Sequence, residues 1–519
     1  MNLRVTQSEK EKGYGKRYIL SVLFSALAFV TNFLITFFLT RAVTERIGVE
    51  ANGFVSMAKT VASYTLILTV ALNSFAARFI SIAYHKGDFE KANRYFSSIF
   101  IADIVLSVFL LFSFSILIIF LEKIFVIPSE LILDVKILFL LDLINFCISS
   151  CSTVFLCSCI IKNRLDLGNL FKFISYFLEG VFLFIAFFFL TPKIYFVGIG
   201  LIISSLFILV SDFFITRKFT PELTIEKKYI SLSAVKEVVF PGLWNSINML
   251  GNTLNSGLDL IVSNLLLNAV KTGLLSIVKS VSTIFISLFQ LVSVPFQPFQ
   301  LKAYSNGNRE KLIDSFKYGI KFNGCLSNVL FGGFAIFGAV FFKLWVPSQD
   351  GDLLQSICLI TILATAIEGA VYPLYFAYTL TLKNKVPCIV TIASGLINVV
   401  SMLILLKLFN ADLFGVVITT TVLAWLVNFI FNPIYSAKCL NLKATTFYPC
   451  LVRHIISTAA VTGVFYCISL IIYPSDWLSL IIIAAVCAII GAIIHFVIVF
   501  DKKDWILVFS KLRRKKLSD

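Results

Sequence analysis

Residues 244–259 have the sequence WNSINMLGNTLNSGLD and lie inside an apolar run from Val238 to Leu267. That run is long enough to cross a bilayer as one helix. Its polar side chains recur at steps of three, four, three and four, which places them on one helical face. They are Asn245, Asn248, Asn252, Asn255 and Asp259, and we call them the asparagine face.

The asparagine face is predicted to line a wet substrate chamber. An amide or carboxylate in hydrocarbon costs free energy unless it is hydrogen-bonded, so the face should not meet lipid tails. The alternative interpretation is that the asparagines only hydrogen-bond to neighbouring membrane helices.

The composition indicates an all-α polytopic membrane protein. Of the 519 residues, 59% are hydrophobic and 14% are charged, and apolar runs alternate with short polar links. Runs of this length are typical of transmembrane helices, and about 14 of them are expected. The predicted spans are 18–40, 53–83, 97–121, 137–161, 173–191, 194–216, 238–267, 273–301, 322–342, 354–382, 386–406, 413–435, 454–473 and 477–500.

Charge predicts the orientation. Most of the 44 lysines and arginines fall in alternate links, on the side of the N-terminus. Such a bias marks the cytoplasmic side, so both termini are predicted to be cytoplasmic in a plasma membrane. The +16 net charge follows this topology, so we predict no nucleic-acid partner. The basic tail Lys511–Lys516 can also contact anionic lipid headgroups.

An internal repeat predicts two parallel six-helix lobes. A shift of 220 residues superimposes Gly53 on Gly273, Lys59 on Lys279 and the link 84–91 on 304–311. An even number of helices per lobe gives both lobes one orientation, with a site expected at their interface. The predicted segments are a cytoplasmic segment 1–17, an N-lobe 18–216, a linker 217–237, a C-lobe 238–435, accessory helices 436–500 and a basic tail 501–519.

Enzyme motifs are missing from the sequence. It contains no Walker A loop, no HExxH, no GxSxG and no Gly-rich dinucleotide fingerprint. None of the 11 cysteines forms a Cys-x-x-Cys pair, and the three histidines are scattered. We therefore predict a protein that is not an enzyme, with no catalytic residue, no metal site and no cofactor.

Ionisable residues inside apolar runs are the main functional candidates, since each needs a partner or a wet cavity. Lys59, Asp259, Lys279 and Glu368 lie well inside their spans, and Asp142 and Glu179 are also intramembrane. Three others lie near span ends, where snorkelling or capping is favoured: Arg78, Asp103 and Asp212.

Lys59 and Lys279 are predicted to act differently. Each lies six residues inside its helix, about 9 Å deep at ~1.5 Å per residue, and Asp259 is placed to pair with Lys279. Leu39 occupies the position equivalent to Asp259 in the first lobe, so Lys59 is expected to lack that acid and to meet water or an anionic ligand, or else to snorkel outward. The predicted cavity residues are Asn32, Lys59, Asn245, Asn248, Asn252, Asn255, Asp259 and Lys279.

A coupling ion is the next prediction. Oxygen ligands suit a hard cation such as Na⁺, and Asp259, Asn398, Thr419 and Thr420 could supply them; H⁺ is the other candidate. Pro295, Pro298 and Pro373 should kink helices 8 and 10 and free backbone carbonyls.

Three features together carry a family resemblance. They are the Tyr-x-x-Gly-x-x-Glu-Lys link after helices 2 and 8, the Lys162-Asn-Arg164 link that falls on Lys383-Asn-Lys385 at a shift of 221, and the added helix pair. With the repeat, they make residues 18–435 resemble the polysaccharide-export flippases of the multidrug/oligosaccharidyl-lipid/polysaccharide (MOP) superfamily.

The resemblance implies a function. Such proteins move an undecaprenyl-pyrophosphate-linked oligosaccharide, a repeat unit of O-antigen lipopolysaccharide or capsule, across the bacterial plasma membrane by alternating access. An ion gradient or the membrane potential would drive the step, and membrane lipids and polysaccharide assembly proteins are the implied partners. A cation-coupled drug exporter, a peptidoglycan lipid-precursor flippase and a membrane glycan polymerase or ligase remain alternatives.

Overall fold

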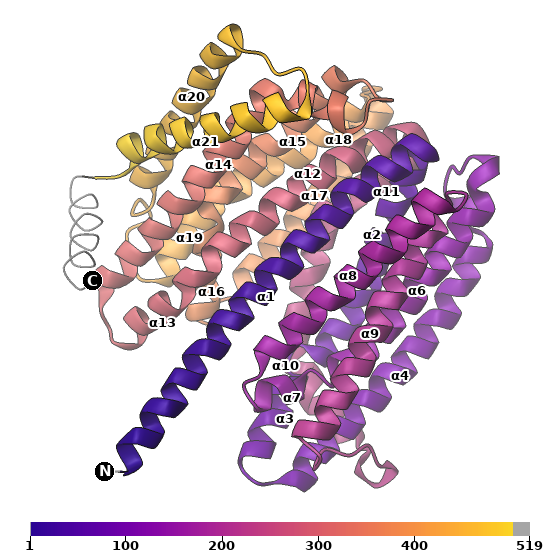
Figure 1. The fold of residues 1–519 in the computed structure, drawn as a ribbon, viewed down its shortest axis with the longest axis vertical. Helices are drawn as coiled ribbons and strands as arrows, with labels where there is room; N and C mark the ends of the chain where they lie inside the picture. Colours follow the sequence, from indigo (N-terminus) through magenta and orange to yellow (C-terminus); the bar gives the residue numbers. More distant parts are fainter. Residues whose placement is uncertain (1, 502–519) are drawn as a thin grey trace. The chain divides into compact units, whose positions relative to one another are not determined.

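The computed structural model describes residues 2–501, and these residues form helices joined by short links, with no β-strand among them (Figure 1). Within this range, 12 helices are long and apolar enough to cross a membrane. The prediction of an all-α polytopic membrane protein is confirmed. Helices 4 and 7 of the predicted fourteen are helical but interrupted and are not among the 12, so the count of 14 stays a prediction.

The helices have the following bounds: α1 Asn2–Arg46, α2 Val49–Asn73, α3 Ala76–His85, α4 Phe89–Ile119, α5 Leu121–Ile124, α6 Ile132–Thr153, α7 Cys157–Ile161, α8 Leu165–Phe189, α9 Tyr195–Phe219, α10 Leu232–Ser256, α11 Leu258–Leu266, α12 Ala269–Ser293, α13 Gln297–Ser305, α14 Arg309–Trp345, α15 Gly351–Val371, α16 Phe376–Leu380, α17 Lys385–Leu408, α18 Leu413–Leu426, α19 Asn432–Cys439, α20 Tyr448–Ile471 and α21 Trp477–Val499. Short 3₁₀ turns join α12 to α13 (η3, Val294–Phe296) and α15 to α16 (η4, Tyr372–Tyr375). The predicted basic residues Lys511–Lys516 lie outside the described range.

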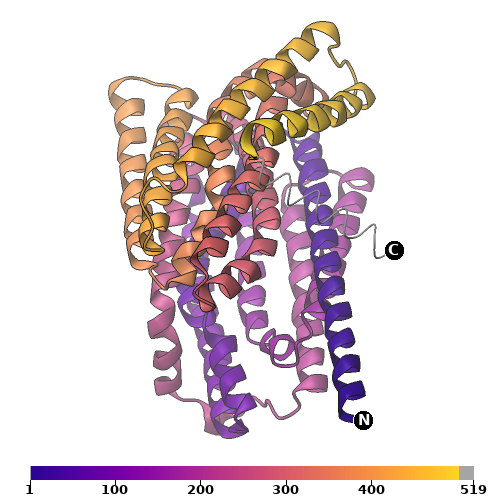
Figure 2. The same ribbon diagram turned by 90° about the vertical axis from the view of Figure 1, so that its left-hand side faces the viewer.

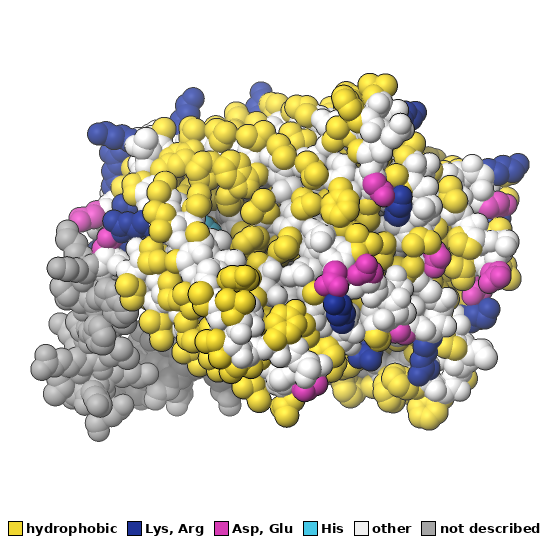
Figure 3. All heavy atoms as spheres, turned by 90° about the horizontal axis from the view of Figure 1, so that it is seen from above, with side chains coloured by type: hydrophobic (Ala, Val, Ile, Leu, Met, Phe, Trp, Pro, Cys, Tyr) yellow, Lys and Arg dark blue, Asp and Glu magenta, His cyan; other side chains and the backbone are white. Residues whose placement is uncertain are grey.

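The chain folds into two compact units. The first comprises Met1–Ser276 with Cys388–Leu396, and the second comprises Ile277–Pro387 with Ile397–Asp519. In the first unit α1 packs along α8, α6 along α9, and α10 along α2. Hydrophobic side chains cover much of the face drawn in Figure 3, which views the molecule from above, with charged groups scattered between them.

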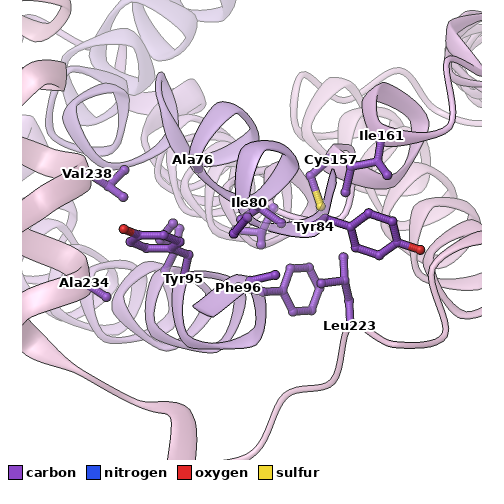
Figure 4. Packing of buried hydrophobic residues seen from close by; sticks show 14 of the residues in the cluster. Ala76, Ile80, Tyr84, Tyr95, Phe96, Cys157, Ile161, Leu223, Ala234 and Val238 are labelled. Carbon is purple, nitrogen blue, oxygen red and sulfur yellow. The ribbon is translucent and has the colours of Figure 1, made fainter. Parts of the chain in front are cut away.

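The hydrophobic core of the first unit includes the linker between the predicted lobes. Ile80 of α3, Phe96 of α4 and Cys157 of α7 are fully or almost fully buried together with Leu223 from the linker (Figure 4). Val238 of α10 closes the same cluster and has no exposed surface. The linker is therefore part of the first unit's packing.

Hydrogen bonds fix the linker to α4 as well. Asn93 donates from Nδ2 to the Glu222 carbonyl at 2.9 Å and accepts from the Thr224 amide at 2.8 Å. The Tyr84 hydroxyl donates to Glu222 Oε2 at 2.8 Å. Hydrogen bonds from the Glu222 backbone N–H and from the Tyr84 hydroxyl hold the pKa of the Glu222 carboxyl below its ordinary value. The Glu222 carbonyl and the Thr224 amide belong to no helix, and Asn93 satisfies both of them.

In the second unit, α20 and α21 form a hairpin that packs against α14 (Figure 2). A buried polar network joins the three helices. His495 contacts the Lys321 carbonyl through Nε2 at 2.9 Å and Asn328 Nδ2 through Nδ1 at 2.9 Å. Because the Asn328 amide N–H₂ can only donate, Nδ1 accepts and the proton is on Nε2. Ser457 also lies 3.1 Å from His495 Nδ1.

Turns after α3 and α13 reproduce the repeat in three dimensions. Gly87 and Gly307 both have positive φ, 77° and 64°, which glycine adopts without steric cost. The next residues, Asp88 and Asn308, cap α4 and α14 by accepting from the amides of Lys91 and Lys311.

The links after α7 and α16 are also equivalent, but in another register. The residue with left-handed backbone is Asn163 in the first link and Leu382 in the second, 219 positions apart. The predicted alignment of Lys162-Asn-Arg164 with Lys383-Asn-Lys385 at 221 is therefore wrong at the turn itself. Similar residue types can occur two positions away from the equivalent site, whereas the position at which a helix ends is fixed by backbone geometry.

Candidate functional site

The four asparagines of the asparagine face lie on α10, and three of them are exposed. Asn245, Asn248 and Asn252 are exposed, whereas Ser246 and Thr253 on the opposite side are buried. Small residues bring that opposite side against α2: Ser246 Oγ donates to the Ile67 carbonyl at 2.6 Å. A Cβ on Gly242 would lie 2.0 Å from the carbonyl oxygen of Ala71 on the same helix. Close packing on α2 thus turns the amides outward from it.

Asn255 has a different role. Its Nδ2 donates to the Thr391 carbonyl at 2.8 Å and to Ser394 Oγ at 3.0 Å, both on α17. The Ser394 hydroxyl lies 3.2 Å from Asn255 Oδ1. Asn255 therefore has the interhelical role that the alternative interpretation assigned to the whole face.

The predicted single helix over 238–267 is wrong, because the helix is interrupted at Gly257 between α10 and α11. A Cβ there would lie 2.8 Å from Thr60 Cγ2 and 2.9 Å from the Thr253 carbonyl, so only glycine fits against α2. Asp259 follows in the first turn of α11. It is 5% exposed, and its Oδ1 accepts from the Leu260 amide at 2.9 Å.

Lys59 lies on α2 with its side chain exposed and has acidic neighbours. Its ammonium interacts electrostatically with Asp142 of α6 and Glu179 of α8, which are 4% and 5% exposed. The contact of Lys59 with an anionic ligand stays a prediction. The sequence comparison considered only the position equivalent to Asp259, whereas these acids lie 83 and 120 residues further along the chain.

The other predicted residues are placed as follows. Asn32 is exposed on α1, and Lys279 is half-buried on α12. Asn398 and Thr420 hydrogen-bond each other, with Asn398 Nδ2 donating to Thr420 Oγ1 at 3.2 Å. Thr419 instead donates to the Val416 carbonyl of its own helix at 2.8 Å. Asp259 belongs to the first unit and the other three to the second, so a shared ion site stays a prediction.

A polar cavity lies at two helix breaks in the second unit. Its volume is about 180 Å³, and it is lined by Ser293, Gln297, Gln300, Tyr372, Pro373, Tyr375, Phe376 and Thr379. Gln300 is 1% exposed, and its Nε2 is buried without a hydrogen-bond partner. Uncharged amides, hydroxyls and aromatic rings form the walls, a lining suited to a neutral hydrogen-bonding group.

The predicted kinks explain where that cavity lies. α12 ends before Pro295, and α15 ends before Pro373, with a 3₁₀ turn at each point. The helices are interrupted at Pro295 and Pro373 as expected, whereas Pro298 lies in the first turn of α13 without a further break. The glutamines and tyrosines beside these prolines did not stand out in the sequence because they follow no helical period, and the prolines were the signal that could have found them.

A second cavity, of about 340 Å³, lies in the first unit between α6, α8 and α9. Ser152, Lys172 and Asp212 are among its lining residues. Asp212 is 5% exposed and accepts from Ser152 Oγ at 3.3 Å. The prediction that Asp212 snorkels to a span end is therefore wrong: the side chain turns inward to a serine on a neighbouring helix.

Comparisons with known proteins add to this description. No protein-family model matches the chain. The uncharacterized membrane protein EpsK of Bacillus subtilis strain 168 is 26% identical over 492 residues, which is 94% of this chain and 97% of that protein.

Two solved structures share the fold at low sequence identity. The lipid II flippase MurJ in an inward closed conformation has a TM-score of 0.66 at 15% identity, over 92% of this chain and 99% of its own. An inward-facing MATE family multidrug resistance transporter of the MOP superfamily has a TM-score of 0.64 at 14% identity, over 82% of this chain and 99% of its own. These likenesses establish the fold: the chain is a multi-pass membrane protein with the fold of MOP-superfamily transporters.

Proposed function

We propose that the protein is a flippase that moves an undecaprenyl-pyrophosphate-linked oligosaccharide, a polysaccharide repeat unit, across the bacterial plasma membrane. It would work by alternating access, driven by an ion gradient or the membrane potential. The fold, shared with a lipid II flippase and with drug exporters, supports transport of an amphiphile. These similar structures are of transporters, which also supports the proposal that the protein is not an enzyme.

One observation favours a sugar cargo: the exposed amides of α10. Asn245, Asn248 and Asn252 are successive exposed side chains on one face of α10. Amides offer both donors and acceptors, which sugar hydroxyls can satisfy and a hydrocarbon chain cannot. The uncharged cavity around Gln300 and Tyr372 has the same chemistry. A hydrated, hydroxyl-rich cargo fits such walls best.

Lys59 is the candidate contact for the carrier's phosphates. It is exposed and positively charged, and Lys meets phosphate as a point charge. Asp142 and Glu179 interact electrostatically with the same ammonium and would compete with an arriving pyrophosphate for it.

A cation-coupled drug exporter is the second candidate. The observation in its favour is the pair of buried acids, Asp142 and Glu179, which could attract an organic cation. An organic cation would not need the amides of the asparagine face, so the glycan proposal is preferred.

Thiol labelling with cargo protection separates the two. In a background without native cysteines, Asn245→Cys, Asn248→Cys and Asn252→Cys should react with a small hydrophilic thiol reagent, and the glycan-linked carrier lipid should slow the reaction several-fold. Ser246→Cys, on the buried side of the same helix, is the matched control and should stay unlabelled. Protection by a lipophilic cation, with none by the glycan lipid, would favour the drug exporter.

A further inference from the structure

Asp103 was expected to snorkel or cap at a span end, and the structure shows otherwise. It lies in the middle part of α4, has no exposed surface, and accepts two hydrogen bonds on Oδ1. Asn73 Nδ2 donates at 2.9 Å and Ser150 Oγ donates at 3.1 Å. Asn73 is the last residue of α2, immediately before the break that separates α2 from α3.

Two oxygens of this group have no hydrogen bond. Asp103 Oδ2 and Asn73 Oδ1 are both buried and unpartnered. Both atoms are acceptors if Asp103 is ionised, so neither can satisfy the other. A buried acceptor without a donor destabilises the folded protein, and a buried carboxylate without a cation does so more strongly.

Among the described residues, no cation compensates Asp103. Ser150 of α6 and Asn73 of α2 donate hydrogen bonds to it, and the Cys151 thiol of α6 interacts with it electrostatically. On other helices packed against α4, Arg78 of α3 is exposed, and Glu237 of α10 accepts from the Tyr95 hydroxyl. Over the part of the chain that the structure describes, no Lys, Arg or His side chain contacts Asp103.

We propose that Asp103 is a proton-binding site, and that the proton on Oδ2 donates to Asn73 Oδ1 to complete a two-way hydrogen-bonded pair. A carboxylic acid and an amide match each other in this way: the amide N–H donates to one carboxyl oxygen while the acid O–H donates to the amide oxygen. One proton then satisfies both unpartnered atoms and neutralises the buried charge.

A proton fits this site better than a metal ion. Asp103 Oδ1 already accepts from two donors, the Asn73 amide and the Ser150 hydroxyl. A hard cation such as Na⁺ needs several oxygen ligands and no N–H group directed at the same carboxylate.

The second unit contains an equivalent hydrogen bond between two helices, but neither of its residues titrates. At a shift of 220 residues Asn73 corresponds to Ser293 and Asp103 to Asn323. Asn323 Nδ2 donates to Ser293 Oγ at 2.8 Å, again joining the last residue of a broken helix to the next long helix. An asparagine is the permanent neutral counterpart of a protonated aspartate. Only the first unit can therefore release a proton at this link.

Loss of the proton would weaken the hydrogen bonding between Asp103 and Asn73 at the break between α2 and α3. The ionised carboxylate loses the donor to Asn73 Oδ1 and faces that oxygen with a negative charge. Proton binding at Asp103 does not depend on which cargo the protein carries.

Infrared spectroscopy of the purified full-length protein in lipid nanodiscs tests the site. The wild type should show a protonated-carboxyl band at neutral pH that Asp103→Asn removes and that Asp212→Asn, a control on another helix, leaves in place. Asn73→Ala should shift the band, because its hydrogen-bond acceptor is gone.

Two results would overturn the proposal. One is the same carboxyl spectrum in the wild type, Asp103→Asn and Asn73→Ala at every pH at which the protein stays folded. The other is a band that appears only when sodium is removed, which would assign the site to a metal ion. Asp103→Asn should fold, since asparagine keeps the shape and the hydrogen bond from Asn73; if it does not, the Asn73→Ala shift alone decides.

Discussion

Gly53 and Gly273, which are equivalent positions of the internal repeat, meet where α2 and the start of α12 cross. A Cβ on Gly53 would lie 2.9 Å from the Gly273 amide nitrogen, and a Cβ on Gly273 would lie 2.1 Å from the Val49 carbonyl oxygen. Two backbones can approach this closely only where neither residue has a side chain. Asn52 Nδ2 adds a hydrogen bond to Ser276 Oγ at 2.7 Å.

Gly273→Ala should therefore destabilise the protein. A methyl group this close to a main-chain oxygen forces the helices apart, and overpacking of this kind costs about 1–3 kcal/mol. Thermal unfolding in detergent should show a clearly lower melting temperature. Gly333→Ala is the control, since a Cβ there meets nothing within 4 Å. Equal melting temperatures for both variants would contradict the close crossing.

The accessory helices should depend on His495. His495→Leu leaves the Lys321 carbonyl, the Asn328 amide and the Ser457 hydroxyl without this partner, and each buried unsatisfied group costs about 1–3 kcal/mol. Limited proteolysis of the link between α20 and α21 should accelerate. The exposed His85, changed to Leu, should leave the rate at the wild-type value.

A pH dependence is expected where the end of α21 meets α20. Arg453 Nη1 donates to Asp501 Oδ1, and this hydrogen bond holds the pKa of Asp501 below its ordinary value. A lowered folded-state pKa means that the stabilisation is present above the unfolded-state pKa and is lost as pH falls through the lowered value. The effect should be modest because the Asp501 side chain is 52% exposed.

The check is a melting curve at several acidic pH values. Asp501→Asn and Arg453→Gln should each lower the melting temperature at neutral pH and flatten its acid dependence. An unchanged acid profile in both variants would show that this ion pair contributes nothing.

The orientation in the membrane is a further prediction. The linker 217–237 and the C-terminal tail are rich in Lys and Arg, which favour the cytoplasmic side. A reporter fused after residue 519 or inserted within 217–237 should be active in the cytoplasm. A periplasmic signal from either fusion would overturn the predicted fourteen spans.

Much of the fold could be predicted from the sequence because the bilayer restricts the possibilities. Long apolar runs must be helices, and Pro295 and Pro373 must break them. Gly87 and Gly307 marked equivalent turns because only glycine takes that backbone conformation easily. These are local rules, and each acts within a few residues of the chain.

The partners of buried charges could not be predicted in the same way. Lys59 interacts electrostatically with Asp142 and Glu179, which belong to two other helices, and the spacing of these residues along the chain contains no sign of it. Burial of Asp103 and Asp212 likewise depends on which way α4 and α9 turn. The asparagine period correctly placed the amides on one face, but neighbouring helices then covered Asn255 and left Asn248 exposed.

Reconstitution into liposomes measures the transport of a glycan-linked carrier lipid itself. Full-length protein in proteoliposomes should speed the transfer of a fluorescent undecaprenyl-pyrophosphate-linked oligosaccharide to the opposite leaflet, measured by loss of protection from a membrane-impermeant quencher. Lys59→Ala should slow this transfer at least tenfold, and Lys59→Arg should retain part of it. Transfer no faster than in protein-free liposomes under an imposed proton, sodium or electrical gradient, with a lipophilic cation transported instead, would contradict the proposed function.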